Sequence, residues 1–248
     1  MGNHAARSGA LLRGGANLRS LSPRRAPAKP LERHRIFLLS PANCGGERAG
    51  LLTNPRARFP LARQLQSDAG APLGEVFAFL SSLYFRGKLA YSRRFAAPPG
   101  ELPGAFVITP GRGLRHESER LRVADLEQIG AVEVSAQNAE FTRPLQRDAE
   151  ALAALAPPSC EFVLLGSIAS DKYVGALVAA LGHALVFPKE FVGRGDMSRG
   201  GLLLRAARSG EPLECVQVLG SARHGARATR IALLRLTPSK PSARRRQP

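Results

Sequence analysis

The residues best suited to chemistry in this chain lie between a strand-like run that ends at Phe187 and a helix-like run that starts near Gly201. Positions 188–201 contain four glycines together with Arg194, Asp196 and Arg199. A glycine-rich connection lets the backbone approach a ligand closely, and the helix that follows directs free N–H groups toward it. The segment therefore predicts a site for an anionic or polar ligand.

Two carboxylates of this segment, Glu190 and Asp196, are the candidate catalytic acids or bases, and either could instead bind a ribose hydroxyl. Arg194 and Arg199 are candidate ligand-binding residues, because a guanidinium can hold a carboxylate or phosphate through two hydrogen bonds. The alternative for Asp196 is that it caps a helix that begins near Ser198.

The elements that must position these residues alternate between strands and helices, and the strand interiors are continuously apolar. This pattern predicts a single three-layer α/β domain over residues 35–220, with a mostly parallel sheet of about five strands. We expect strands at 35–40, 105–109, 162–167, 184–187 and 213–219, with a short edge strand at 132–134. We expect helices at 73–95, 124–130, 147–155, 171–181 and 201–208, and irregular chain at 47–72.

Each of the first four predicted strands ends in small or polar residues. Ligands of open α/β sheets bind beyond the carboxyl ends of the strands, so we expect these ends to converge on one crevice. The first end contains Asn43, which could read the edge of a base or sugar, and Cys44, which could be a nucleophile if a base lay nearby. An unreactive loop cysteine is the alternative.

The next two strand ends supply further ligand-binding candidates. Thr109 and Arg112 lie in a Thr-Pro-Gly-Arg-Gly sequence, which lacks the Gly-Lys-Ser/Thr ending of a Walker loop but could present the arginine to a phosphate. A simple turn is the alternative. Ser167 and Lys172 follow the third strand, where the serine could also act as a helix cap and the lysine could be an exposed helix residue.

The net charge of +17 is concentrated at the two ends of the chain. Residues 1–36 contain eight Lys/Arg and one acid, and residues 221–248 contain eight Lys/Arg and no acid, which leaves 20 bases and 18 acids between them. We expect a disordered basic extension at 1–34 and a basic C-terminal segment at 221–248. Such extensions are usually solvated, although they can bind nucleic acid without sequence specificity.

Composition excludes several classes of site. The three cysteines are far apart and the five histidines show no ligand spacing, so we expect no disulfide framework, metal site or cofactor, and a cytoplasmic location. No apolar run is long enough to predict a membrane helix.

Three segments in sequence order carry a family resemblance: Leu39-Ser-Pro, the run from Ser82 to Tyr91, and the run from Val107 to Leu114. In this order the chain resembles an uncharacterised bacterial and phage domain family that is similar to peroxide-stress proteins and to uracil-DNA-glycosylase-like modules of tRNA transglycosylases. The family pattern Ser-Ala-Lys-His-Gly is replaced here by the sequence that starts at Thr109, so its histidine is missing. The resemblance implies chemistry related to nucleic acids or nucleobases.

Together these observations predict a protein that binds a nucleotide, nucleobase or nucleic-acid element at the strand ends, and that could act on an N-glycosidic bond. Two other classes stay open. One is a non-catalytic nucleic-acid accessory protein that works through its basic extensions, and the other is a small-molecule hydrolase or transferase that uses Cys44.

Overall fold

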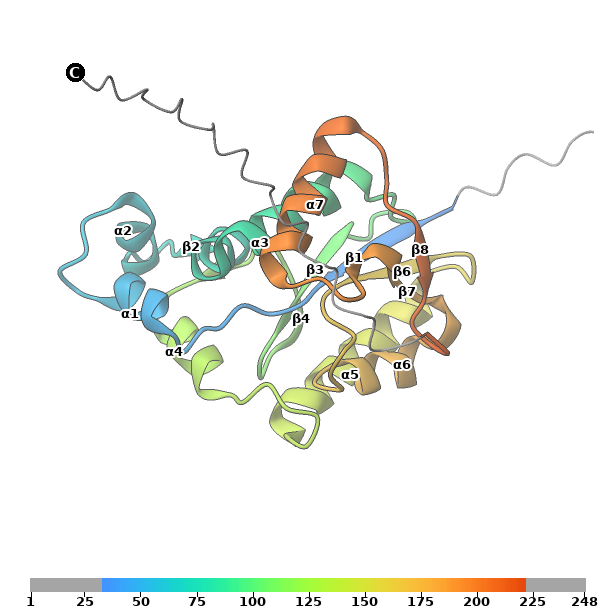
Figure 1. The fold of residues 1–248 in the computed structure, drawn as a ribbon. Coiled ribbons are helices and arrows are strands. Elements are labelled where there is room, and N and C mark those ends of the chain that lie inside the picture. The colour runs from blue at the N-terminus through green and yellow to red at the C-terminus, as the bar shows by residue number, and fades with distance from the viewer. Residues whose placement is uncertain (1–32, 222–248) are drawn as a thin grey trace, which may run out of the picture. The chain divides into compact units, whose positions relative to one another are not determined.

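The computed structural model describes residues 33–221. The predicted basic extensions therefore lie outside the described residues, apart from their inner ends. The described part folds around one six-stranded sheet with the strand order β4-β3-β1-β6-β7-β8 (Figure 1). The strands of this sheet are β1 (Arg35–Leu39), β3 (Ala105–Thr109), β4 (Gly113–His116), β6 (Glu161–Leu165), β7 (Leu185–Pro188) and β8 (Cys215–Gln217).

The α/β class and the mostly parallel sheet are confirmed, while the predicted number of five strands is wrong. β1, β3, β6 and β7 run parallel, and β4 and β8 add antiparallel edges. The unpredicted strand is β4, which pairs with β3 across a tight turn in which Gly111 and Gly113 have φ of 74° and 75°. Its sequence, Gly-Leu-Arg-His, is too short and polar to be read as a buried strand.

Helices cover both faces of the sheet (Figure 1). The long α3 packs along α7 on one face, and α5 packs along α6 on the other. The helices are α1 (Glu47–Thr53), α2 (Pro60–Gln66), α3 (Leu73–Phe95), α4 (Val123–Ala131), α5 (Ala139–Leu155), α6 (Val174–Leu181) and α7 (Asp196–Ser209). Two 3₁₀ turns, η1 (Gly182–Ala184) and η2 (Lys189–Phe191), flank β7, and β2 (Ala71–Pro72) pairs with β5 (Arg120–Leu121).

Several predicted boundaries differ from the structure. The stretch predicted as irregular contains α1 and α2, whose rows of apolar residues are too short to show a clear period. α5 begins eight residues before its predicted start at Arg147, because it tolerates Pro144 and is capped by Asn138, whose Oδ1 accepts the N–H of Glu140 at 3.0 Å. The predicted edge strand at 132–134 is not formed.

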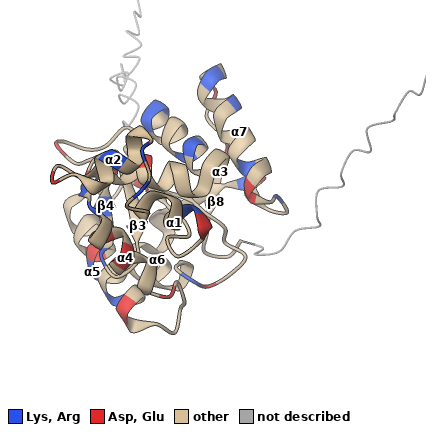
Figure 2. Cartoon of the chain, turned by 90° about the vertical axis from the view of Figure 1, so that its left-hand side faces the viewer, with Lys and Arg blue, Asp and Glu red and all other residues tan. Residues whose placement is uncertain are grey.

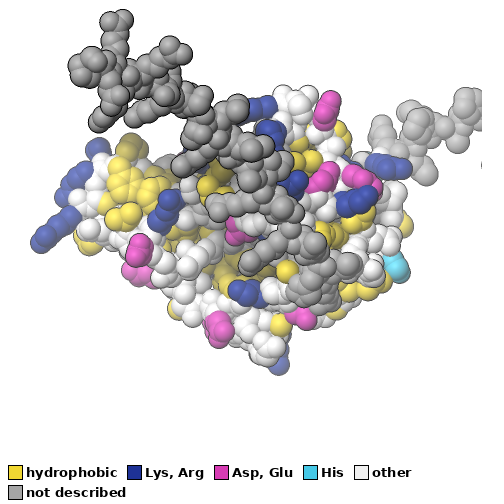
Figure 3. All heavy atoms as spheres, viewed as in Figure 1, with side chains coloured by type: hydrophobic (Ala, Val, Ile, Leu, Met, Phe, Trp, Pro, Cys, Tyr) yellow, Lys and Arg dark blue, Asp and Glu magenta, His cyan; other side chains and the backbone are white. Residues whose placement is uncertain are grey.

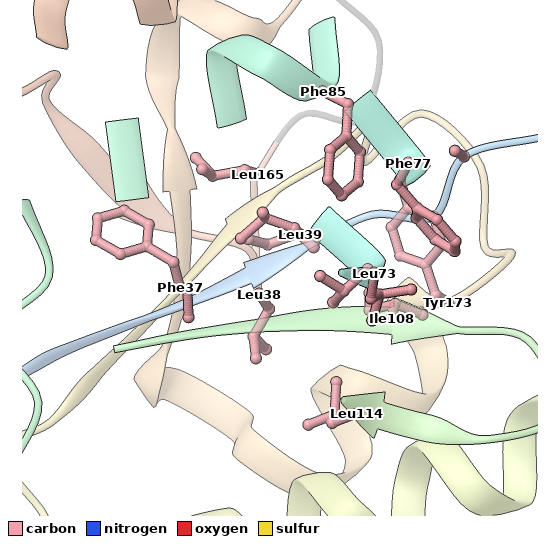
Figure 4. Close-up of a cluster of buried hydrophobic side chains, with 14 of the residues drawn as sticks. Phe37, Leu38, Leu39, Leu73, Phe77, Phe85, Ile108, Leu114, Leu165 and Tyr173 are labelled. Carbon is pink, nitrogen blue, oxygen red and sulfur yellow. The ribbon is translucent and has the colours of Figure 1, made fainter. Parts of the chain in front are cut away.

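The core lies on both sides of β1, which is the central strand of the sheet. Successive side chains of a strand point to opposite faces, and Figure 4 shows Leu39 on the side of Phe85 and Leu38 on the side of Leu114. The ring of Phe37 packs edge-on against Tyr91 of α3, with centroids 5.6 Å apart. The side chains of β1 therefore pack against the helical layers on both faces of the sheet.

The contact between α3 and α7 depends on two glycines. A Cβ on Gly87 would lie 2.8 Å from the carbonyl oxygen of Gly200, and a Cβ on Gly200 would lie 2.8 Å from the Cα of Tyr84. Since these atoms are backbone, no side chain can move aside to make room. The two helix axes consequently approach more closely than larger residues would permit.

α3 is interrupted at Ser82, which has φ of 52° and ψ of −126°. This conformation is normally restricted to glycine and costs on the order of 1–3 kcal/mol in other residues. The interruption separates the first part of α3, which stacks Phe79 on Phe59 next to α2, from the second part, which packs on α7.

Charged and apolar residues gather over different helices of the described part of the chain. Lys and Arg residues recur along α3 and α7 (Figure 2). Apolar side chains and basic groups lie together over α1 and α2, where Leu51 is 55% exposed (Figure 3).

Candidate functional site

A cavity of about 860 Å³ lies beyond the carboxyl ends of the parallel strands. Each of four strands or the segments that follow them contributes to its lining: Ser40 after β1, Pro110 after β3, Ser167 after β6 and Asp196 after β7. The chain order reverses direction at β1, since β3 lies on one side of it and β6 on the other. The cavity therefore occupies the topological switch point, where α/β proteins commonly bind ligands.

A lysine and a serine meet in this cavity. Lys88 reaches from α3 to the end of β1, where its Nζ donates to Ser40 Oγ at 2.7 Å and to the carbonyl oxygen of Ser40 at 3.0 Å. The Lys88 side chain is 1% exposed, and its Nζ lies 4.1 Å from the ring centroid of Tyr84 and 5.1 Å from that of Phe85. The ammonium group is thus held by two oxygens and two aromatic faces.

Burial changes the protonation of this lysine. Loss of water around the charged form lowers the pKa of Lys88 to about 7; Asp196 partly opposes this shift and Arg199 adds to it. At neutral pH a substantial fraction of the amine is consequently unprotonated. An unprotonated amine can accept a proton, which the ordinary exposed lysine cannot do at this pH.

Two tyrosines complete this part of the lining. The Oη of Tyr173 donates to the carbonyl oxygen of Ser167 at 3.0 Å. The Oη of Tyr84 is buried and makes no hydrogen bond of normal geometry among the described residues, although Arg199 is near enough to act on it electrostatically. Burial raises the pKa of both phenols, so both are hydrogen-bond donors at any physiological pH.

Gly166 permits this arrangement. A Cβ at this position would lie 2.6 Å from the Oη of Tyr173 and 2.9 Å from the Cβ of Ser40. Any larger residue would push apart the tyrosine and the serine that the cavity brings together.

Five of the predicted site residues line the cavity: Asn43, Cys44, Ser167, Lys172 and Asp196. Asn43 Oδ1 accepts the N–H of Gly45 at 3.2 Å, and Ser167 Oγ accepts the N–H of Ala169 at 3.3 Å, so both hold their own loops. Cys44 is buried, and burial raises the pKa of its thiol to about 12. A thiol with such a pKa is a poor nucleophile at neutral pH.

The other five predicted site residues do not line the cavity: Thr109, Arg112, Glu190, Arg194 and Arg199. Arg112 pairs with Asp125 at 2.7 Å, and buried Thr109 donates to the carbonyl oxygen of Val107 at 3.1 Å. One carboxylate oxygen of Glu190 is buried without a hydrogen bond to another described residue, and Glu190 acts electrostatically on Cys215 of β8.

The two arginines of the glycine-rich segment have different surroundings. Arg194 contacts Ser198 at 3.2 Å. Arg199 is buried and donates from Nε and Nη2 to the carbonyl oxygen of Phe191 and from Nη1 to Asp196. The Arg199 guanidinium therefore connects the start of α7 to η2, and its three nitrogen atoms donate to oxygens of the protein itself.

Ser40, Lys88, Tyr84 and Tyr173 were not predicted as site residues. A signal for the lysine exists: Tyr84, Lys88 and Tyr91 follow one another at four- and three-residue steps, which places the lysine between two aromatic residues on one face of α3. Lysines on helices are normally exposed, and a lysine on a buried helix face is rare. Such a lysine is therefore a candidate site residue.

Among residues 33–221 no cluster of His, Cys, Asp and Glu could hold a metal ion, and no helix there is long and apolar enough to cross a membrane. Comparison of the chain with protein-family models, curated proteins and solved structures finds no match. The family resemblance of the sequence therefore stays a prediction, and the geometry of the cavity carries the functional argument.

Proposed function

We propose that the cavity at the ends of β1 and β6 binds a polar, weakly charged small molecule of the nucleoside or nucleobase class. Its volume of about 860 Å³ suits such a ligand, since small-molecule sites commonly measure about 300–1,000 Å³. The observation that carries the proposal is the chemistry of the lining, which is rich in neutral hydrogen-bonding groups.

Hydroxyl and amide groups surround the cavity and can both donate and accept. They belong to Ser40, Ser81, Ser135, Ser167, Ser170, Tyr84, Tyr173, Asn43 and Gln137. Such groups match the hydroxyls of a sugar and the mixed donor and acceptor edge of a base. The tyrosine rings add apolar surface against which a planar base can pack.

The charges of the lining favour a nucleoside over a nucleoside triphosphate. The charged groups of the lining are two lysines, Lys88 and Lys172, and three carboxylates, those of Glu133, Asp171 and Asp196. Phosphate groups are usually held by several cations or by a helix N-terminus. The predicted arginines lie outside this lining, and the starts of α6 and α7 that reach it bring the carboxylates of Asp171 and Asp196 with them. Asp196, whose side chain is 70% exposed, is the carboxylate that we propose accepts hydrogen bonds from ligand hydroxyls.

A thermal-shift screen of nucleosides, nucleobases, free sugars and nucleoside triphosphates tests the proposal. A nucleoside at about 100 times its Kd adds about 2.7 kcal/mol of stability, which corresponds to a rise in Tm of roughly 5–10 °C for a domain of this size. Asp196→Asn should reduce the shift. Arg112→Ala should leave it unchanged, because this arginine pairs with Asp125 away from the cavity.

Two results contradict the proposal. One is the absence of a shift with every nucleoside and nucleobase. The other is a shift that only triphosphates produce and that Arg112→Ala abolishes, which would place a phosphate site outside the cavity.

A further inference from the structure

The contact between Lys88 and Ser40 has the geometry of a base and a nucleophile. Their 2.7 Å separation between Nζ and Oγ is a short hydrogen bond, and both residues line the cavity. A nucleophile within hydrogen-bond reach of a base, with the base oriented by a third group, is the recurring arrangement of covalent catalysis. Here the third group is the carbonyl oxygen of Ser40, 3.0 Å from the same Nζ.

The positions of the two residues are fixed independently of each other. Ser40 directly follows β1, the central strand, and its N–H donates to the carbonyl oxygen of Leu165 at 3.2 Å. Lys88 is anchored on α3 one residue after Gly87, where the close contact with α7 holds the helix in place. The pair is thus mounted on rigid elements, which covalent catalysis requires.

We propose that Ser40 is a nucleophile for acyl transfer and that Lys88 is its general base. The proposal goes beyond the binding role of the cavity and uses the same space. Ser40 Oγ attacks the carbonyl carbon of an ester or amide in the cavity as its proton passes to Lys88 Nζ. The carbon–oxygen or carbon–nitrogen bond of the leaving group then breaks, and Lys88 returns the proton to that group. Water releases the acyl group from Ser40 by the same route in a second step.

The groups that face Lys88 support this role. The ammonium has no carboxylate within hydrogen-bond distance among the described residues, since Asp196 on α7 acts on it only electrostatically and Arg199 opposes protonation. Tyr84 and Tyr173 stay protonated, because burial raises their pKa values. The lysine can therefore be unprotonated at neutral pH, as a general base must be.

Two probes test the proposal on the full chain: a fluorophosphonate and p-nitrophenyl acetate. The fluorophosphonate should form a Ser40 Oγ–phosphorus bond with loss of fluoride, detected by intact mass and located by peptide mass spectrometry. Labelling should fall by at least about 100-fold in Ser40→Ala and in Lys88→Met, given the typical contribution of a general base. It should also accelerate as the pH rises through about 7, where the pKa of Lys88 lies.

Ser92→Ala is the matched control. Ser92 is a buried serine on α3, the helix that carries Lys88, and it lies outside the cavity, where its Oγ donates to the carbonyl oxygen of Leu89. This variant should label and hydrolyse like the wild type. Lys88→Arg serves as a second variant: it keeps a cation but offers no neutral base near pH 7, so it should be as inactive as Lys88→Met.

Three results overturn the proposal: no label on the folded wild type, equal labelling of Ser40→Ala, or a labelling rate in Lys88→Arg equal to that of the wild type. These outcomes are separate from the nucleoside screen. Labelled Ser40 with no nucleoside shift would retain the catalytic pair and reject the ligand class, and the reverse would retain the ligand class alone.

Discussion

Replacing Lys88 with methionine should change how the stability of the protein depends on pH. The lysine is 1% exposed, and methionine fills a similar volume without a charge. The pKa of Lys88 is about 7 in the folded protein, against 10.5 for an ordinary lysine. The folded state therefore binds this proton more weakly than the unfolded state does.

The sign and the size of the effect follow from linkage. Below about pH 7 the lysine is protonated in both states, and its burial destabilises the fold by on the order of 5 kcal/mol. Between about pH 7 and 10.5 only the unfolded state holds the proton, so stability rises with pH by up to ~1.4 kcal/mol per unit. From pH 6 to pH 9 the wild type should gain about 2–3 kcal/mol relative to the variant.

Other consequences of the substitution depend little on pH. The variant loses the two hydrogen bonds to Ser40, about 1 kcal/mol each, which the neutral amine can also make. Lys88→Met should therefore be more stable than the wild type by about 3 kcal/mol at pH 6 and about as stable at pH 9. The two stability curves should converge as the pH rises.

Urea unfolding of both proteins at pH 6, 7.5 and 9, followed by circular dichroism, measures the difference. Groups that titrate identically in the two proteins, such as Cys44, cancel from it. A difference that is constant over this range would refute the reasoning, because it would mean that the buried lysine keeps an ordinary pKa.

Three further predictions concern the backbone and the thiols. Ser82→Gly should raise the free energy of unfolding by about 1 kcal/mol, measured by urea unfolding, because glycine adopts φ of 52° without strain; a loss of stability would contradict it. Gly200→Ala should lower the free energy of unfolding by about 2–3 kcal/mol, because the new Cβ meets the backbone of α3. The control Gly201→Ala should be neutral or stabilising, because its Cβ would have only the end of the Arg205 side chain nearby, at 3.4 Å. Similar values for the two variants would show that α3 and α7 can separate. The Cys44 thiol should react with a disulfide reagent at pH 8 about 1,000-fold more slowly in the folded than in the unfolded protein, as followed by peptide mass spectrometry, and equal rates would show that its pKa is not raised to about 12.

The sequence predicted the framework of the fold because that information is local. Apolar runs such as 105–109 and 162–167 are buried on both faces, and continuous burial distinguishes parallel strands from amphipathic ones. The three- and four-residue spacing of apolar residues likewise predicted the span of α3, but not its interruption at Ser82. β4 was not predicted, because its pairing depends on the turn after β3. α1 and α2 were not predicted, because each has only seven residues.

For the candidate site, composition could indicate the strand ends but not the side chains that meet there. Asn43, Cys44, Ser167, Lys172 and Asp196 follow strands or open a helix, and these positions are visible in the sequence. The arginines of the glycine-rich segment meet the same sequence criterion, yet Arg199 donates to the carbonyl oxygen of Phe191 inside the protein. Packing decides whether a donor faces a cavity or a carbonyl group.

Only the tertiary structure could bring Ser40 and Lys88 together, because 48 residues separate them in the chain. Their contact requires α3 to cross the end of β1, where Gly166 leaves space for Ser40 and Tyr173. The same part of α3 packs closely on α7 through Gly87 and Gly200. The sequence alone determined that there is a sheet with polar ends. The packing of one helix over that sheet decided which lysine is buried, and hence which serine can be activated.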